Sequence, residues 1–208
     1  MKAEKQVGVL TPSDREAIHR TSMRLLQRTG VRVDSAEVLQ RLRAGGAVVD
    51  GKTNTVHFPE DLIWRLVKGC PSEVFLGDRR GTPQVVGVEG GTCFWPGNAL
   101  YLVEGQTRRL LEERDFARLT RLADRLDRVH AMVGVSVADF EPPVRDFCTF
   151  RLMAQHTTKH LRPVITSVAG IEAVLEMAEV LEAGRPEGSG RCLSFGYSIV
   201  SPLRWTET

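Results

Sequence analysis

The chain has 208 residues, of which 42% are hydrophobic and 26% charged, a balance typical of a globular protein with a sizeable core. The formal net charge of +2 is too small, and the basic residues are too scattered, to indicate nucleic-acid binding. No apolar run reaches the roughly 20 residues of a membrane span, and no signal peptide opens the chain, so we expect a cytoplasmic protein without a membrane partner.

Short helices and one hairpin are predicted for the first 70 residues or so. Ser13 and Glu16 have the spacing of a capping box, and the helix they open ends at Gly30. A second short helix precedes the paired glycines of "RAGGAVVD". Residues 47–58 contain two turn dipeptides and predict a hairpin, after which Pro59 opens a third helix.

Residues 73–103 have a different character. Short β-type runs are separated by glycines, which favours a meander or irregular sheet over helices. A long amphipathic helix is then predicted over residues 112–127, with Phe116, Leu119 and Leu126 on its apolar face.

From residue 129 onward, apolar strands and amphipathic helices alternate. We predict strands near 130–138, 163–168 and 191–201, roughly 30 residues apart, which is the size of a βαβ unit. Runs that are apolar on both faces are typical of a parallel sheet covered by helices. An open doubly wound sheet and an eight-stranded barrel both accept this pattern, but no G-x-G-x-x-G follows a strand to favour dinucleotide binding.

Several motifs resemble the trimethylamine methyltransferase family. They are "TGVRVDS" followed by "GAVVD" and "FPEDL", "TTK" before a predicted strand, and "SPLRW" after the last one. The resemblance covers nearly the whole chain but only the first half of the family's length. It implies an α/β fold: a partial (β/α)8 TIM barrel over residues 111–208, preceded by a helical and small β elaboration over residues 1–110.

The resemblance also implies a function. The chain would be the N-terminal fragment of a corrinoid-dependent methyltransferase, which moves a methyl group from a small tertiary or quaternary amine, such as trimethylamine or glycine betaine, to the Co(I) of a corrinoid protein. The corrinoid (cobalamin) would be carried by that cognate partner and not held tightly by this chain. The alternative is a non-catalytic half-barrel that associates with a separately encoded second half. The unpaired edge strands of such a half-barrel could also pair with a second copy of the chain, so a homo-oligomer is a further possibility.

Barrel enzymes carry their chemistry at the carboxyl ends of the strands. At these ends we predict substrate contacts from Asp139, Phe140, Tyr197, Ser198 and Ser201, and in the loop "FWPGNA" from Trp95 and Asn98. Aromatic faces and a carboxylate are the natural partners of an alkylated ammonium. The alternative for each residue is an ordinary cap, turn or core position. The sequence assigns no catalytic residue.

The segment "HTTKH" places His156 and His160 four residues apart, a spacing that can bring two imidazoles to one metal on a helix. No acidic third ligand lies within the motif, and Pro163 indicates that the helix is ending there. We therefore predict no metal site.

Overall fold

The computed structural model describes residues 9–81, 84–87, 91–183, 185, 189–196 and 201–206. The chain divides into two compact units, one formed by Met1–Pro71 with Ser198–Thr208 and the other by Ser72–Tyr197. Helices and small sheets make up both, so the predicted α/β class is confirmed, and the described residues form no closed barrel. The partial barrel, and the boundary at residue 110, stay predictions.

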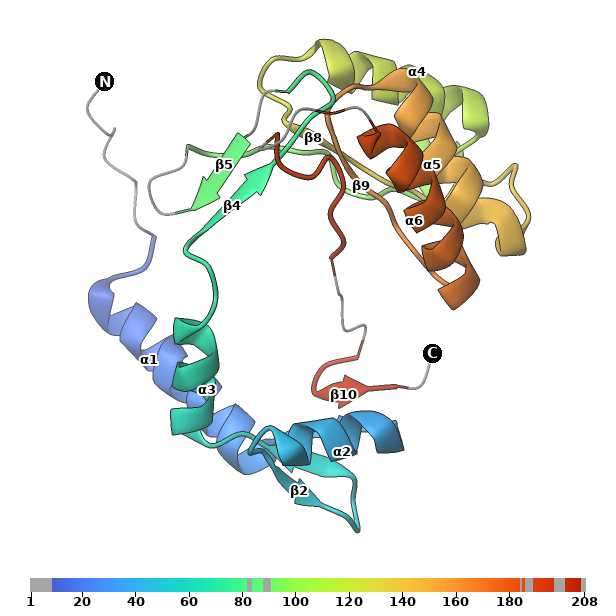
Figure 1. Cartoon of the computed structure of the whole chain (residues 1–208). Coiled ribbons are helices and arrows are strands. Elements are labelled where there is room, and N and C mark those ends of the chain that lie inside the picture. The colour runs from blue at the N-terminus through green and yellow to red at the C-terminus, as the bar shows by residue number, and fades with distance from the viewer. Residues whose placement is uncertain are drawn as a thin grey trace. The chain divides into compact units, whose positions relative to one another are not determined.

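The first unit is built on a four-stranded sheet in the order β10-β1-β3-β2 (Figure 1). Strand β10 runs parallel to β1, whereas β3 is antiparallel to both β1 and β2. Three helices join these strands, and α1 continues directly into a π-helical segment, η1. The bounds are α1 (Pro12–Arg24), η1 (Leu25–Thr29), β1 (Val31–Val33), α2 (Ala36–Ala44), β2 (Val48–Asp50), β3 (Thr55–His57), α3 (Glu60–Lys68) and β10 (Arg204–Trp205).

The caps of these helices follow the sequence with one correction. The predicted capping box of Ser13 and Glu16 is wrong, because Pro12 takes the first helical position and Thr11 becomes the N-cap, paired with Asp14. The stop at Gly30 is confirmed. Its φ of 74° lies in the left-handed region, and an added Cβ would lie 2.6 Å from the Val56 carbonyl oxygen.

The second unit begins with two separate antiparallel hairpins, where the glycine-rich runs predict a meander or irregular sheet. Strand β4 (Glu73–Leu76) pairs with β5 (Gln84–Gly87), and β6 (Tyr101–Glu104) pairs with β7 (Thr107–Leu110).

Strands and helices then alternate. The elements are α4 (Glu113–Arg125), β8 (Ala131–Val133), the 3-10 turn η2 (Pro142–Val144), α5 (Arg145–His156), β9 (His160–Arg162) and α6 (Val168–Glu182). Strands β8 and β9 pair in parallel, which confirms the predicted orientation for this pair. Single parallel bridges extend the arrangement, one between Leu161 and Leu193 and one between Leu76 and Arg191.

The predicted ends of these strands are wrong. Strand β8 stops at Val133, because the apolar run beyond it leaves the ladder and bonds to several segments in turn: Gly134 N donates to Arg162 O, Ser136 N to Ala99 O and Ala138 N to Leu111 O. Strand β9 lies at residues 160–162 instead of 163–168, since Pro163 has no N–H to donate. The predicted strand 191–201 contributes only bridges at Arg191, Leu193 and Ser201, and its residues 197–200 lie outside the described residues.

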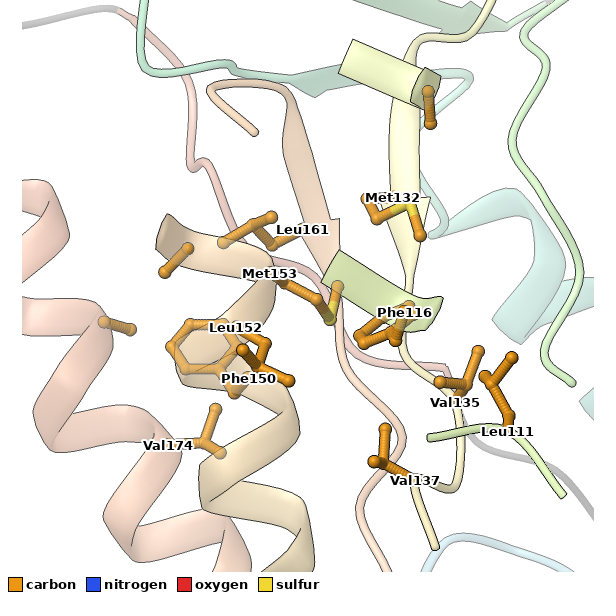
Figure 2. Close-up of a cluster of buried hydrophobic side chains, with 13 residues drawn as sticks. Leu111, Phe116, Met132, Val135, Val137, Phe150, Leu152, Met153, Leu161 and Val174 are labelled. Atoms are coloured by element: carbon orange, nitrogen blue, oxygen red, sulfur yellow. The ribbon is translucent and has the colours of Figure 1, made fainter. Parts of the chain in front are cut away.

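One hydrophobic cluster joins β8 and β9 to the three helices that follow the hairpins (Figure 2). Each element contributes a buried side chain: Phe116 from α4, Met132 from β8, Phe150 from α5, Leu161 from β9 and Val174 from α6. The helices therefore cover one face of the β8–β9 pair (Figure 1). Within the described residues, no helix has both the length and the apolar character needed to cross a membrane.

Candidate functional site

The two faces of the β8–β9 pair have different compositions. Met132 and Leu161 are register partners and point into the cluster with the helices. Side chains alternate across a strand, so the neighbouring partners must lie on the opposite face. These are Ala131 with His160, and Val133 with Arg162. The face turned away from the helices therefore carries an imidazole and a guanidinium beside two small apolar residues.

His160 is fixed on this face by two hydrogen bonds. Its Nδ1 lies 3.0 Å from the carbonyl oxygen of Gly77, and its Nε2 lies 2.8 Å from Ser194 Oγ. A carbonyl can only accept, so Nδ1 carries the proton and Nε2 accepts from the serine hydroxyl. The side chain is 2% exposed, and this burial lowers the pKa of His160. The neutral imidazole is thus held in one tautomer at neutral pH.

This environment predicts that the free energy of unfolding falls as the pH drops. The pKa of His160 is lower in the folded state than the value of about 6.5 expected in the unfolded chain. Below a pH of about 6.5 the unfolded chain binds more protons at His160 than the folded chain does. The stability that neutral His160 contributes is therefore present above this pH and is lost on acidification. Urea unfolding at pH 8 and pH 5 should show a smaller decrease for His160→Gln than for the wild type. Equal decreases would contradict the assignment, because the other four histidines are present in both proteins.

Arg162 is the last residue of β9, one register step closer to the carboxyl end than His160. Its guanidinium lies against Gly196, where an added Cβ would overlap Nη2. The side chain is half-buried, and the described part of the chain gives it no hydrogen bond and no ion pair. Ser194, two residues before Gly196, is hydrogen-bonded to His160. His160 and Arg162 therefore both contact the segment of residues 194–196.

The amino end of β9 has a structural role. Lys159 Nζ donates to the carbonyl oxygens of Ala123 and Leu126 at the end of α4, at 2.7 and 2.6 Å. Asp124 accepts from Thr157 Oγ1 and Thr158 N. Burial alone would raise the pKa of Asp124, but these hydrogen bonds outweigh it and hold the pKa below its ordinary value. The "TTK" motif therefore ties α4 to the start of β9.

The imidazoles of "HTTKH" do not share a helix face. His156 ends α5, whereas His160 lies in β9, because the helix stops before Thr157. Both ring nitrogens of His160 are already hydrogen-bonded. Among the described residues, no three His, Cys, Asp or Glu side chains are grouped in a way that could hold a metal ion.

Asp139 and Phe140 follow β8 at some distance along the chain. Asp139 is exposed, and its carboxylate accepts the backbone N–H of Glu113 at the start of α4. Phe140 packs against the hydrophobic cluster, and its carbonyl oxygen accepts two hydrogen bonds from the Arg145 guanidinium. Both residues thus have structural contacts in addition to their predicted role at the substrate.

The other predicted contacts are dispersed. Trp95 is 42% exposed and follows Phe94, whose carbonyl oxygen accepts from His130 N before the start of β8. Asn98 is exposed and precedes Ala99, which bonds to Ser136 beyond the end of β8. Ser201 belongs to the other compact unit, where it bridges to Arg204. Tyr197 and Ser198 lie outside the described residues.

The sequence patterns did not single out Arg162 or Ser194, and they placed His160 in the connector before the predicted strand instead of in a strand. The signal was present in Pro163, which cannot donate to a β-ladder and therefore favours a strand that ends before it. Placing the strand at "HLR" would have put His160 and Arg162 on one face by alternation.

Comparison with known proteins gives a consistent result over the whole chain. A family model described as trimethylamine methyltransferase (MTTB) matches residues 2–208. The trimethylamine methyltransferase MttB of Desulfitobacterium hafniense is 29% identical over 205 residues, which cover 95% of this chain and 41% of that relative. The trimethylamine methyltransferase MttB2 of Methanosarcina mazei is 28% identical over 142 residues, covering 65% of this chain and 29% of that relative. The chain therefore spans less than half the length of the curated relatives it matches.

Proposed function

The chain belongs to the trimethylamine methyltransferase family, and from this premise we propose that it is the N-terminal part of a corrinoid-dependent methyltransferase acting on a tertiary or quaternary amine. The observation that carries the proposal is the match of the family model over residues 2–208. The matched relatives are longer than this chain, so the complete activity would need residues in addition to these 208.

The second unit would supply the first βα modules of a (β/α)8 barrel. Three features support this: β8 and β9 are parallel, α4, α5 and α6 pack on one face of the pair, and Leu193 extends the parallel pairing beyond β9. In a barrel, the face turned away from the helices lines the interior, and the chemistry lies at the carboxyl ends of the strands. Arg162 and the segment around Gly196 would then lie near the mouth.

The substrate amine would be held mainly by aromatic faces and a carboxylate, because a quaternary nitrogen neither donates nor accepts hydrogen bonds. Each cation–π contact contributes about 0.5–2 kcal/mol. Phe140, Trp95 and Tyr197 are the proposed aromatic contacts and Asp139 the proposed carboxylate. Asn98 would supply a hydrogen bond to polar substituents. Ser198 and Ser201, which belong to the other compact unit, stay predictions from the sequence.

The corrinoid would supply a strongly nucleophilic Co(I) that accepts the methyl group. By the family resemblance the corrinoid would be carried by the cognate partner protein. His160 would not ligate its cobalt, because both of its ring nitrogens are hydrogen-bonded within the chain. The task of this chain would be to orient the amine and exclude water from it.

The exposed face of α6 fits both the proposal and the alternative of a non-catalytic half-barrel that associates with a separate second half. Helix α6 exposes a row of apolar side chains at helical spacing: Val168, Ile171 and Leu175, at 74%, 40% and 45%. A further βα module could cover this row whether it belongs to the same chain or to another.

Methyl transfer by the complete gene product tests the proposal. The protein would be mixed with its corrinoid protein in the Co(I) state and with trimethylamine, glycine betaine or carnitine, and the corrinoid absorbance would be followed. We expect one of these amines to be demethylated in proportion to the Co(I) consumed. A folded product that demethylates none of them, but binds a separately encoded second half, would favour the alternative.

A further inference from the structure

We infer that the chain associates with a second copy of itself through two helices of the second unit, with a basic side of α4 in one copy packed against an acidic side of α6 in the other. This inference does not rest on the proposed function, because it uses only these two helix surfaces. Both surfaces expose apolar side chains, and their charges are opposite.

The side of α4 that faces the β6–β7 hairpin is an apolar groove. The groove has a volume of about 520 Å³, and Leu102 of β6 lines it together with Leu119 and Leu122 of α4. Leu119 and Leu122 are 38% and 55% exposed, and Leu126 at the end of the helix is 47% exposed. Exposed leucines at intervals of three and four residues form a stripe along a helix, which is the pattern of a packing face.

The same groove is positively charged. Arg118, Arg121 and Arg125 line it at intervals of three and four residues, so they form a row beside the leucines. The two carboxylates of the groove, on Glu104 and Asp115, are both ion-paired with an arginine of β7. The groove therefore presents a net positive charge to a partner. We call the three arginines and the leucines beside them the basic face of α4.

Helix α6 has a surface of the opposite charge. Its exposed apolar row, from Val168 to Leu175, is accompanied by three exposed glutamates, Glu172, Glu176 and Glu179. The helix contains no Lys, Arg or His, so no basic residue of α6 offsets these charges. We call the apolar row and the three glutamates the acidic face of α6.

The two faces match in length. On each helix the three like charges span seven residues, which is about 10 Å along the helix axis, and an apolar row runs beside them. Packed together, the faces would bring leucines of α4 against the apolar row of α6 and arginines opposite glutamates. Exposed ion pairs contribute little individually, so the apolar rows would supply most of the affinity and the charges would select which faces meet.

Both faces are available to another copy of the chain. Within one copy, α5 packs against both α4 and α6 (Figure 1). In the part of the chain that the structure describes, neither the three arginines of α4 nor the three glutamates of α6 form an ion pair with each other or with another residue. Each copy carries one face of each kind, so a two-fold symmetric dimer can form both contacts at once.

Analytical ultracentrifugation of the full 208-residue chain with two charge-reversal variants tests this inference. One variant reverses the basic face of α4, with Arg118→Glu, Arg121→Glu and Arg125→Glu. The other reverses the acidic face of α6, with Glu172→Arg, Glu176→Arg and Glu179→Arg. We expect the wild type to form a dimer and each variant alone to have a dissociation constant at least tenfold higher. An equimolar mixture of the two variants should form a heterodimer, because the reversed α4 of one then meets the reversed α6 of the other.

A third variant provides the control for the change in charge. Arg15→Glu, Arg20→Glu and Arg24→Glu reverse three exposed arginines of α1, which belongs to the other compact unit. This variant should dimerise as tightly as the wild type, because the reversal leaves α4 and α6 unchanged.

Three results would overturn the inference: a wild type that stays monomeric, reversal variants that dimerise as tightly as the wild type, or a mixture of the two variants that forms no heterodimer. If a reversal variant loses its circular dichroism signal, Leu122→Gln decides. Leu122 is exposed, so this variant should fold, and it should still weaken the dimer at least threefold. None of these outcomes bears on the proposed function, which is tested by methyl transfer.

Discussion

Replacing Phe150 with alanine is expected to lower the free energy of unfolding by about 3–5 kcal/mol. The ring is 0% exposed and lies within the cluster that joins β8 and β9 to the helices (Figure 2). Its removal would take away apolar contacts and leave a cavity, because the surrounding side chains come from different elements and cannot all move inward. The effect is large because this cluster is the main link between the sheet and helices of the second unit.

Phe147 provides the matched control. It lies on the same helix and is 37% exposed, so Phe147→Ala should cost far less. Urea unfolding followed by circular dichroism would measure both variants. A loss below about 1 kcal/mol for Phe150→Ala, or equal losses for the two variants, would show that α5 is not packed on the strands as described.

Replacing Gly134 with alanine is the second large change, with an expected loss of about 1–3 kcal/mol or more. An added Cβ would lie 2.6 Å from the backbone nitrogen of Val164 and 3.2 Å from two backbone atoms of Pro163. Backbone atoms cannot turn aside as a flexible side chain can. Gly134 N also donates to Arg162 O, so the substitution would push apart the two segments that hold Arg162 in place.

Gly97→Ala serves as the comparison for this variant. A Cβ at Gly97 meets nothing within 4 Å, and its φ is not in the left-handed region. There the alanine should be neutral, or stabilising by about 0.4–1 kcal/mol, because it restricts the unfolded chain. The melting temperatures of the two variants should therefore differ. Gly134→Ala should melt well below the wild type, and Gly97→Ala at or slightly above it. A Gly134→Ala variant as stable as Gly97→Ala would contradict the close approach of β8 to the segment after β9.

The helices were the most predictable part of the fold. Helix α2 ends where Gly45 and Gly46 interrupt the apolar pattern, and α4 follows its amphipathic period closely. These signals are local, so they can be found in a few neighbouring residues. The cap of α1 was misplaced for an equally local reason, since Thr11 and Ser13 both precede suitable acidic partners.

Strand limits were less predictable, because they depend on distant partners. Residues 134–138 are as apolar as the strand before them, but their backbone groups bond to three different segments instead of one ladder. No local pattern distinguishes the two cases. The residues of the candidate site were hard to predict for the same reason. The position of strand β9, at 160–162 instead of 163–168, decides which side chains lie on the face away from the helices.

The sequence could not predict that Arg162 has no hydrogen-bond or ion-pair partner among the residues that the structure describes. The chain contains 26 acidic residues, and any of them could have been its partner. Only the folded arrangement gives partners to the other half-buried arginines and a glycine to Arg162. By contrast, the family resemblance was carried by short motifs, and the match over residues 2–208 confirms it.

A crystal structure of the complete gene product with a bound amine substrate would test the central claim most directly. We expect β8, β9 and the segment at Leu193 to be consecutive parallel strands of a closed barrel, with His160 and Arg162 inside it and the amine bound at the carboxyl ends of the strands. A barrel that places Arg162 among the outer helices, or an open sheet whose free face binds no amine, would contradict it.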